Sequence, residues 1–296
     1  MSSAASGRAQ TNANAYLSLG LGVVILAWAP LLMRWAGAPG VATAFFRNSI
    51  AVVVIVLPFW WKRRSAERVV RSAFWLALLA GVSYGVDTGL WSTGIILSGV
   101  ANPTLLANTA PVWVGLGAML LFRERLGTGF WVGLGLAMAG AVLILGLDRW
   151  QSVLAGTGSL YGLLAGFFYA GFFLAAQKAR ETMDAISFIW IAFASSACVL
   201  GVSTAALQQP ILGYGLSTYL IFLALGVVHV AAWLALTYSL GLLPASTVAP
   251  IMLVQPVISA GLAHFLLGER LGPWQSLGGV AVLAGVMLVH RQRTQE

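Results

Sequence analysis

Charged residues are scarce in this chain of 296 residues: only 8% are charged, whereas 59% are hydrophobic. A soluble domain carries about 25% charged residues, so this composition could not cover a surface that faces water. The mean hydropathy of +0.90 agrees with a surface that faces lipid. The scarcity of charge therefore excludes an ordinary soluble protein and indicates an integral membrane protein.

Residues that carry common enzyme chemistry are also rare. Cys198 is the only cysteine and lies inside an apolar run, which excludes an internal disulfide and a thiolate metal site. The sequence has no Walker-type phosphate loop, no metal-ligand spacing of His, Cys, Asp and Glu, and no supported Ser/His/Asp set. We therefore expect no cofactor, no metal and no ATP hydrolysis. The net charge of +8 lies in short loops between apolar runs, so it indicates membrane topology, and no nucleic-acid partner is expected.

Long apolar runs fill most of the chain, and a membrane-spanning helix needs about 20 mostly apolar residues. The runs are too long and too continuously apolar for the alternating strands of a membrane barrel. The fold class that we expect is therefore all-α and membrane-integral. Ten transmembrane helices are predicted, at residues 16–35, 40–61, 72–94, 99–122, 128–147, 157–177, 185–206, 215–240, 244–267 and 273–290.

The distribution of Lys and Arg predicts the topology. If the N-terminus is cytoplasmic, only Arg34, Arg149 and Arg270 lie outside, and the other loop cations lie inside. Both termini are thus expected in the cytoplasm, with residues 1–15 forming a disordered tail. Ala27-Trp28-Ala29 resembles a signal-peptide cleavage site, but the apolar run continues beyond it, so we interpret this run as a retained helix.

A short phrase occurs twice in the sequence, 145 residues apart. Arg123-Glu124-Arg125-Leu126-Gly127 follows the fourth apolar segment, and Gly268-Glu269-Arg270-Leu271-Gly272 follows the ninth. Within the preceding segments, Pro111 and Pro256 match at the same offset. A duplicated apolar unit of this kind is typical of transporters built from two repeats.

The repeat divides the chain into two five-helix units, at residues 16–147 and 157–290. Because five is an odd number, the second unit must cross the membrane in the opposite sense. Glu124 is then expected inside and Glu269 outside. Inverted repeats of this kind place a binding site near the middle of the membrane, at the boundary between the units.

Ten helices, two five-helix units and a G-E-R-L-G-type motif after the fourth and ninth helices resemble the drug/metabolite transporter superfamily, and within it the EamA family. Arg47, in Phe45-Phe46-Arg47, is similar to an arginine that recurs in the second helix of that family. The first copy differs from the family motif in one position, because Arg123 stands where Gly is usual. The resemblance covers residues 16–290 and implies export of amino acids, other metabolites or drugs, mostly across the bacterial inner membrane. An aromatic-rich interior, as argued next, is similar to that expected of the family's aromatic amino-acid exporters.

Polar residues inside a membrane are costly, so each is a candidate for function. Asp87 is the only carboxylate well inside a predicted span, and Tyr84, Asp87 and Trp91 share one face of the third helix. Two interpretations of Asp87 stay open. It forms a buried structural ion pair with Arg47, or it binds a substrate ammonium or carries a coupling proton.

A second face of the third helix carries Gly81, Gly85 and Gly89 at four-residue steps. A ridge of small residues lets two helix backbones approach closely. We therefore expect this face to pack against a neighbouring helix, and the face with Tyr84 to line a cavity.

The repeat offset maps Tyr84 onto His229 in the eighth helix, and Trp233 follows His229 one turn later. The matched positions make both helix faces candidates for the same central cavity. His229 is either a packing residue or a site residue. Asp87 maps onto Ala232, so a carboxylate role is confined to the first unit.

The helices interrupted by Pro111 and Pro256 are expected to kink and to free backbone carbonyls. Asn108 either forms hydrogen bonds with the backbone groups that the kink frees, or faces the substrate. Trp28 and Tyr169 occupy similar positions in the first and sixth helices. Rings at membrane mid-depth favour a substrate with an aromatic or apolar body, because rings stack on it and Trp attracts a cation. The alternative is that these rings face lipid.

These patterns predict a secondary transporter that works by alternating access, with the two units rocking about a cavity formed by helices 1, 3, 4, 6, 8 and 9. The expected partners are the lipid bilayer and a small-molecule substrate, an amino acid or a similar amphipathic metabolite, and we expect a monomer. A multidrug or cation exporter of the same fold is the alternative. An enzyme acting on lipid-linked substrates and a non-transporting receptor or scaffold are further rivals. The predicted substrate-binding residues are Trp28, Tyr84, Asp87, Trp91, Asn108, Tyr169, His229 and Trp233.

Overall fold

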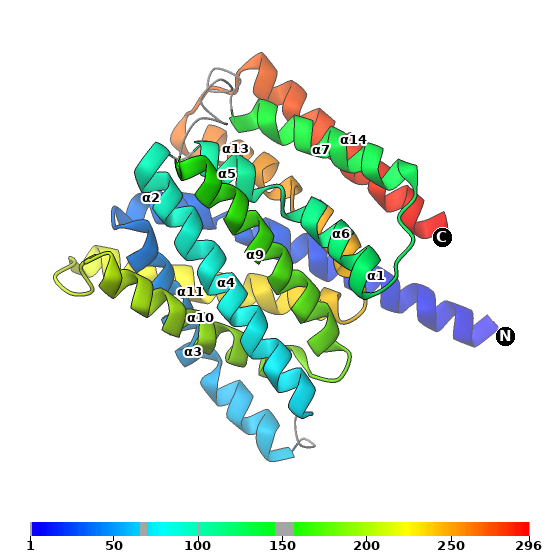
Figure 1. The fold of residues 1–296 in the computed structure, drawn as a ribbon, viewed down its shortest axis with the longest axis horizontal. Coiled ribbons are helices and arrows are strands. Elements are labelled where there is room, and N and C mark those ends of the chain that lie inside the picture. Colours follow the sequence, from blue (N-terminus) through cyan, green and yellow to red (C-terminus); the bar gives the residue numbers. More distant parts are fainter. Residues whose placement is uncertain (1, 66–69, 100, 146–156, 296) are drawn as a thin grey trace.

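Helices make up every regular element in the described part of the chain (Figure 1). The computed structural model describes residues 2–65, 70–99, 101–145 and 157–295. In chain order the helices are α1 (Ser2–Leu26), α2 (Ala29–Ala36), α3 (Gly40–Ser65), α4 (Arg71–Ser98), α5 (Ala101–Ala107), α6 (Ala110–Leu121), α7 (Thr128–Leu145), α9 (Thr157–Arg180), α10 (Ala185–Ala206), α11 (Leu216–Leu240), α12 (Ala245–Ile251), α13 (Val254–Leu267) and α14 (Pro273–Gln295).

These helices account for the ten predicted spans. Among the described residues, nine helical stretches are long and apolar enough to cross a membrane, and the tenth, Thr128–Ile144, is shorter. Residues 146 and 147 of the fifth predicted span and Arg149 lie outside the described residues. The expected all-α membrane fold is therefore confirmed.

Three of the predicted spans are interrupted near their middle. The first is divided into α1 and α2, the fourth into α5 and α6, and the ninth into α12 and α13. Pro30 and Pro111 each stand in the first turn of the helix that follows a break, where proline loses no helical hydrogen bond. The sixth span, which matches the first in the repeat, is the continuous helix α9, because Ala175 stands where the first has Pro30.

A disordered tail was the expectation for residues 1–15, whereas the structure has residues 2–15 in a helix. The chain is helical from Ser2, and α1 runs without interruption to Leu26. Ala15 is fully buried, and the Ser239 hydroxyl donates a hydrogen bond of 2.8 Å to its carbonyl oxygen. The polar N-terminal residues have ordinary helix propensity, so they continue a helix whose second half is fixed by packing on α11.

The repeat is visible in where the helices begin. α3 begins at Gly40 and α10 at Ala185, α4 at Arg71 and α11 at Leu216, and α7 at Thr128 and α14 at Pro273. Each of these pairs is separated by 145 residues, the offset of the duplicated motif. The two units thus share one plan of helices, turns and breaks.

Equivalent helices of the two units run antiparallel. α7 and α14 lie side by side at one edge of the molecule (Figure 1) and cross at glycines. A Cβ atom on Gly133 would lie 2.8 Å from the Gly285 oxygen, and one on Gly140 would lie 2.5 Å from the Gly278 oxygen. The contact that lies later along α7 lies earlier along α14, so these two equivalent helices run antiparallel. The second unit is therefore inverted relative to the first.

The helix contacts obey the same two-fold relation. α4 packs along α9, and the equivalent helices α11 and α1 also pack together. α10 contacts α4, and α3 contacts α11 in the same way. α3 contacts α10, and α7 contacts α14. In each of these pairs the two helices are equivalent to each other, so the two-fold relation maps the pair onto itself. A pseudo-two-fold axis therefore relates the units and passes through the centre of the bundle.

The predicted glycine ridge of α4 is confirmed as a packing face. A Cβ atom on Gly81 would lie 2.0 Å from the Ala192 oxygen of α10, and one on Gly85 would lie 2.8 Å from Val199 Cβ. Such distances exclude any side chain, so the glycines are required for the close approach of α4 and α10. This packing turns the opposite, aromatic face of α4 toward the centre.

Candidate functional site

Tyr84 of α4 and His229 of α11 face each other at the centre of the molecule. Their ring centroids lie 5.9 Å apart. The two residues occupy the same position in the two units, and each lies near the middle of its helix. Contact between two such equivalent residues places the pseudo-two-fold axis between their rings.

Rings from the second unit surround this pair. Trp233 lies 5.4 Å from Tyr84 in an edge-to-face arrangement, and Phe172 lies 5.2 Å from it. The His229 imidazole stacks on Phe193 at 4.6 Å, and Tyr169 lies 6.2 Å from Tyr84. The structure therefore brings together four of the eight predicted site residues in one aromatic group.

Arg47 of α3 extends into this group. Its Nη2 donates a hydrogen bond of 3.2 Å to the Tyr84 hydroxyl, and the residue is only 8% exposed. Its Nε has no hydrogen-bond partner among the described residues. A buried guanidinium with an unused donor is costly in a membrane interior, which is typical of a site that a ligand completes.

Asp87 lies almost one turn beyond Tyr84 on α4 and is also 8% exposed. The charge of Arg47 acts on the Asp87 carboxylate, yet the two side chains are not among the ion pairs within 4.0 Å formed by the described residues. The structure thus does not form the direct Arg47–Asp87 ion pair that was one interpretation of Asp87. Both side chains are buried, and no direct ion pair joins them among the described residues.

His229 and Trp233 add polar atoms that lack partners. His229 is 1% exposed, and neither of its ring nitrogens has a hydrogen-bond partner within the described residues. The Trp233 Nε1 is buried and unpartnered in the same sense. Buried polar groups are normally hydrogen-bonded, so three side chains with unmet hydrogen bonds at one place make this region a candidate functional site. We call Arg47, Tyr84, Asp87, Tyr169, Phe172, Phe193, His229 and Trp233 the central cluster.

Trp91 and Asn108 lie at a neighbouring place, where α4 meets the break between α5 and α6. The Trp91 Nε1 donates a hydrogen bond of 3.0 Å to the Thr104 hydroxyl, and the Asn108 backbone N–H donates to the Thr104 carbonyl. Neither residue is in ring contact with the central cluster among the interactions of the described residues. Asn108 retains a buried Nδ2 without a partner there, so its role at the break or toward a substrate stays a prediction.

Trp28 lies apart from the other predicted site residues. It stands at the break between α1 and α2, is 37% exposed, and has no ring contact among those of the described residues. A side chain of α13 binds a carbonyl that is freed at this break: the Ser259 hydroxyl donates a hydrogen bond of 2.9 Å to the Ala27 oxygen. Trp28 was predicted as a site residue because Tyr169 has a similar position in the sixth span. The first span is divided before Pro30 into α1 and α2, whereas α9 is continuous, so the two spans follow different courses.

The break between α5 and α6 rests on two glycines of α9. A Cβ atom on Gly162 would lie 2.5 Å from Pro103 Cα, and one on Gly166 would lie 2.9 Å from the Leu106 oxygen and the Thr109 hydroxyl. The backbone of the broken span therefore packs directly against the backbone of α9. This packing fixes α9, and with it Tyr169 and Phe172, beside α4.

The duplicated motif forms matching caps at the ends of α6 and α13. Arg123 has φ +56° and Gly268 has φ +68°, both in the left-handed region. The following N–H groups, of Glu124 and Glu269, donate to the carbonyls of Ala118 and Ala263. The Glu124 carboxylate accepts a hydrogen bond from Ser246, and Glu269 pairs with Arg34. The motif thus fixes helix ends and lies away from the central cluster.

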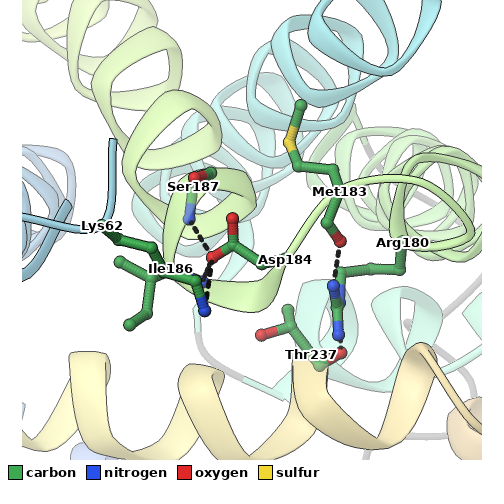
Figure 2. Close-up of polar contacts among 7 residues, drawn as sticks. All are labelled: Lys62, Arg180, Met183, Asp184, Ile186, Ser187 and Thr237. Carbon is green, nitrogen blue, oxygen red and sulfur yellow. Dashed lines mark hydrogen bonds and ion pairs between the residues drawn. The ribbon is translucent and has the colours of Figure 1, made fainter. Parts of the chain in front are cut away.

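Polar contacts join α3, α9, α10 and α11 where α9 ends (Figure 2). Asp184 caps α10 by accepting hydrogen bonds from the N–H groups of Ile186 and Ser187, and it pairs with Lys62 of α3 at 3.6 Å. Burial raises the pKa of the Asp184 carboxyl, but the hydrogen bonds from Ser187 and Ile186 and the charge of Lys62 outweigh burial, so the net pKa lies below its ordinary value.

Arg180 makes the second set of contacts at this end (Figure 2). Its Nε donates a hydrogen bond of 2.9 Å to the Thr237 carbonyl of α11, and its Nη1 donates to the Met183 carbonyl. The bond to Thr237 ties the end of α9 to α11, and the bond to Met183 closes the turn that follows α9. The first bond thus joins the two helices that supply Tyr169, Phe172, His229 and Trp233.

The sequence did not identify Phe172 and Phe193 as parts of the site. Phe172 lies three residues after Tyr169 on α9, so helical spacing was a signal for it. Phe193 matches Asn48 in the repeat and lies on a helix that was not expected at the centre. The helices that supply the central cluster are α3, α4, α9, α10 and α11, the second, third, sixth, seventh and eighth spans; the expected set was 1, 3, 4, 6, 8 and 9.

The sequence and the fold both have known counterparts. The sequence model of the EamA-like transporter family matches the chain twice, at residues 14–146 and 156–291. An uncharacterized transporter of Archaeoglobus fulgidus is 26% identical over 275 residues, which cover 92% of this chain and 94% of that protein. An uncharacterized transporter of Synechocystis is 21% identical over 309 positions, covering 96% and 92%. A solved crystal structure that is 17% identical shares the fold, with a TM-score of 0.77 over 94% of this chain and 98% of that one.

Proposed function

Because the chain belongs to the EamA-like transporter family, we propose that it is a secondary transporter that exports an amino acid or a similar amphipathic metabolite by alternating access. It is a multi-pass membrane protein, and its relatives are transporters of unassigned substrate. The observation that carries the proposal is the central cluster. Buried polar side chains of the first unit and rings of both inverted units meet there on the pseudo-two-fold axis, where a binding site of this architecture is expected.

A difference in packing between equivalent helices supports alternating access. α6 buries Ala110, Pro111, Val114, Gly115 and Ala118, whereas the equivalent helix α13 has no buried residue. A symmetric bundle would bury both. Inverted-repeat transporters exchange such packing between the units as the site opens to one side and then to the other. In this proposal α13 lies on the side that is open in this conformation.

The distribution of Lys and Arg supports the orientation of the protein in the membrane. In the proposed orientation both termini lie in the cytoplasm of a bacterial cell, α6 ends at the cytoplasmic face and α13 at the outer face. The conformation with loosely packed α13 is then outward-facing. Export requires this state to release the substrate and the reverse state to load it from the cytoplasm.

Each group in the central cluster has a chemical role in this proposal. Tyr169, Phe172, Phe193 and Trp233 provide ring faces for an apolar or aromatic substrate body. Asp87 binds an ammonium group or carries a coupling proton, and His229 supplies an unused hydrogen-bonding ring. Trp28, Trp91 and Asn108 belong to the proposed path of the substrate, outside the central cluster.

Flux in proteoliposomes tests the proposal. Purified protein is reconstituted, and efflux of radiolabelled aromatic amino acids, aliphatic amino acids and organic cations is measured with and without a collapsed proton gradient. We expect protein-dependent efflux of at least one amino acid, reduced in Trp233→Ala. Absence of flux for every class, together with turnover of a lipid-linked substrate, would instead support a membrane enzyme.

One alternative substrate class has a specific observation in its favour. A buried carboxylate beside several rings is the arrangement that binds organic cations, and Asp87 with Tyr84 and Tyr169 fits this description. A multidrug or cation exporter would show flux of cations and none of amino acids in the same experiment.

A further inference from the structure

The two broken spans meet at one side of the molecule and not at the other. α6 packs on α12 and closely on α9. The equivalent helices α13 and α5 do not pack together in this way among the described residues, and α13 makes less contact with α2. A Cβ atom on Gly117 of α6 would overlap Leu174 of α9, whereas nothing lies within 4 Å of the Cβ position of Gly261 on α13. We call the side where α6 meets α12 the closed side.

Polar side chains join the helices of the closed side. The Ser246 hydroxyl of α12 donates a hydrogen bond to the Glu124 carboxylate, which follows the end of α6. Ser246 is fully buried, and Glu124 is half-buried. The Gln177 side chain of α9 accepts a hydrogen bond of 2.6 Å from the N–H of Ala245, at the start of α12. Hydrogen bonds to a carboxylate are roughly twice as strong as those between neutral groups, so the Ser246–Glu124 bond is the stronger of these two links.

The other side of the molecule lacks the hydrogen-bond donor of this link. The residue equivalent to Ser246 is Ala101, which has no hydroxyl. Glu269, the equivalent of Glu124, is present but pairs with Arg34, and these two side chains are 49% and 65% exposed. An exposed ion pair contributes little stability. The link between α12 and the end of α6 therefore has no equivalent that α5 and α13 could form.

This asymmetry has an energetic consequence for alternating access. A contact that exists in only one of two conformations shifts their equilibrium by the whole of its free energy. The conformation closed at α6 and α12 contains the Ser246–Glu124 bond. The reverse conformation, in which α5 and α13 meet, loses this bond and gains none in its place, because Ala101 stands where a donor is needed.

We propose that Ser246 and Glu124 form a latch that keeps α6 and α12 together and makes the α13-open conformation the resting state of the protein without substrate. This inference rests on the proposed transport function, in whose orientation the latched side is the cytoplasmic one. Opening of the latch is then the step that gives a cytoplasmic substrate access to the site. It assigns a gating role to the first copy of the duplicated motif.

Cysteine reactivity in the purified protein without substrate tests the latch. Ala118 of α6 and Ala263 of α13 are equivalent residues, and each is replaced by cysteine in a separate protein that lacks Cys198. The ratio of the Ala118→Cys rate to the Ala263→Cys rate, measured with a water-soluble maleimide, reports the balance between the two conformations. We expect Ser246→Ala and Glu124→Ala each to raise this ratio by about tenfold, because either change removes a hydrogen bond to a charged group.

Two matched controls separate loss of the latch from general loosening. Ser196→Ala removes a hydroxyl as buried as that of Ser246 but on α10, where it has no partner among the described residues. Glu181→Ala removes a carboxylate that pairs with Lys178 in the turn after α9. Both should keep the wild-type ratio. Folding of every variant is verified by gel filtration. A wild-type ratio in both Ser246→Ala and Glu124→Ala overturns the latch, and so does an equal rise in the controls.

Flux of the same variants in proteoliposomes separates this inference from the proposed function. A raised ratio in the latch variants without flux of any substrate class would support the latch and reject transport. A wild-type ratio in latch variants that still transport would reject the latch and leave the transporter intact. A raised ratio together with altered flux in the latch variants, and wild-type flux in the controls, supports both.

Discussion

Tyr84 and His229 are equivalent residues of the two units, 145 positions apart in the sequence, and their rings lie 5.9 Å from each other at the centre of the bundle. This contact locates the pseudo-two-fold axis. It also shows how far the repeats have diverged, because the residues around the axis differ: the first unit contributes Arg47 and Asp87, and the second contributes most of the rings. A symmetric scaffold therefore surrounds an asymmetric site.

The helix caps of the duplicated motif provide a first prediction. Arg123 has φ +56°, a conformation that costs an L-residue about 1–2 kcal/mol and glycine almost nothing, and its equivalent is Gly268. Arg123→Gly should therefore raise the free energy of unfolding by about 1 kcal/mol, and Gly268→Arg should lower it by a similar amount. Unfolding of the purified protein in detergent measures both. A loss of stability in Arg123→Gly would show that the Arg123 side chain matters more than its backbone strain.

Close backbone packing at the α5–α6 break gives a second prediction. A Cβ atom on Gly162 would lie 2.5 Å from Pro103 Cα, a backbone atom that cannot move away cheaply. We expect Gly162→Ala to lower the free energy of unfolding by about 1–3 kcal/mol and to reduce flux. Gly20→Ala is the matched control, since nothing lies within 4 Å of its Cβ position. The packing argument fails if both variants are as stable as wild type.

The cap of α10 predicts a pH dependence. Hydrogen bonds from Ser187 and Ile186 and the charge of Lys62 hold the pKa of Asp184 below its ordinary value of 3.8, despite burial. The ionised carboxylate therefore contributes stability that is complete above pH 3.8 and is lost as the pH falls through the lower pKa of the folded state.

Asp184→Asn tests this contribution, because asparagine also caps helices but does not titrate. The variant should be less stable than wild type by up to about 1 kcal/mol above the ordinary pKa, since the pair is partly exposed. The difference should shrink with acidification below it. A difference that is constant over the acid range would mean that the charge of Asp184 contributes nothing to stability.

Unequal packing of α6 and α13 makes a prediction about access. Ala118 and Ala263 are equivalent residues, but Ala118 is buried and Ala263 is not. In a background lacking Cys198, we expect Ala263→Cys to react faster than Ala118→Cys with a water-soluble maleimide in the purified protein. Equal rates would indicate that the looser packing of α13 does not correspond to an open, hydrated side.

Much of the fold could be predicted because it depends on local composition and on the repeat. Apolar length sets the spans, and Pro111 and Pro256 each lie within three residues of a break. The glycine ridge of α4 was identifiable from spacing alone. The helix at the N-terminus was not expected, because at Ala15 it is held by a contact with Ser239, 224 residues away, which no local pattern records.

The site was predicted only in part, for a similar reason. Tyr84, His229 and Trp233 were found from their matched or adjacent positions, and they meet at the centre. Phe193 and the contact of Arg47 with Tyr84 were missed because they depend on how α3 and α10 cross, which helical periodicity does not determine. The break beside Trp28 separated it from the cluster despite its suggestive repeat position.

Counterflow tests the central claim most directly: proteoliposomes are loaded with unlabelled L-phenylalanine, and uptake of external radiolabelled L-phenylalanine is followed for wild type, Asp87→Asn and the surface variant Arg125→Gln. The account predicts transient accumulation of label with wild type and Arg125→Gln, and a loss of about tenfold or more with Asp87→Asn. Equal accumulation with Asp87→Asn and wild type, or none above protein-free liposomes with any of them, would contradict a substrate site built on the central cluster.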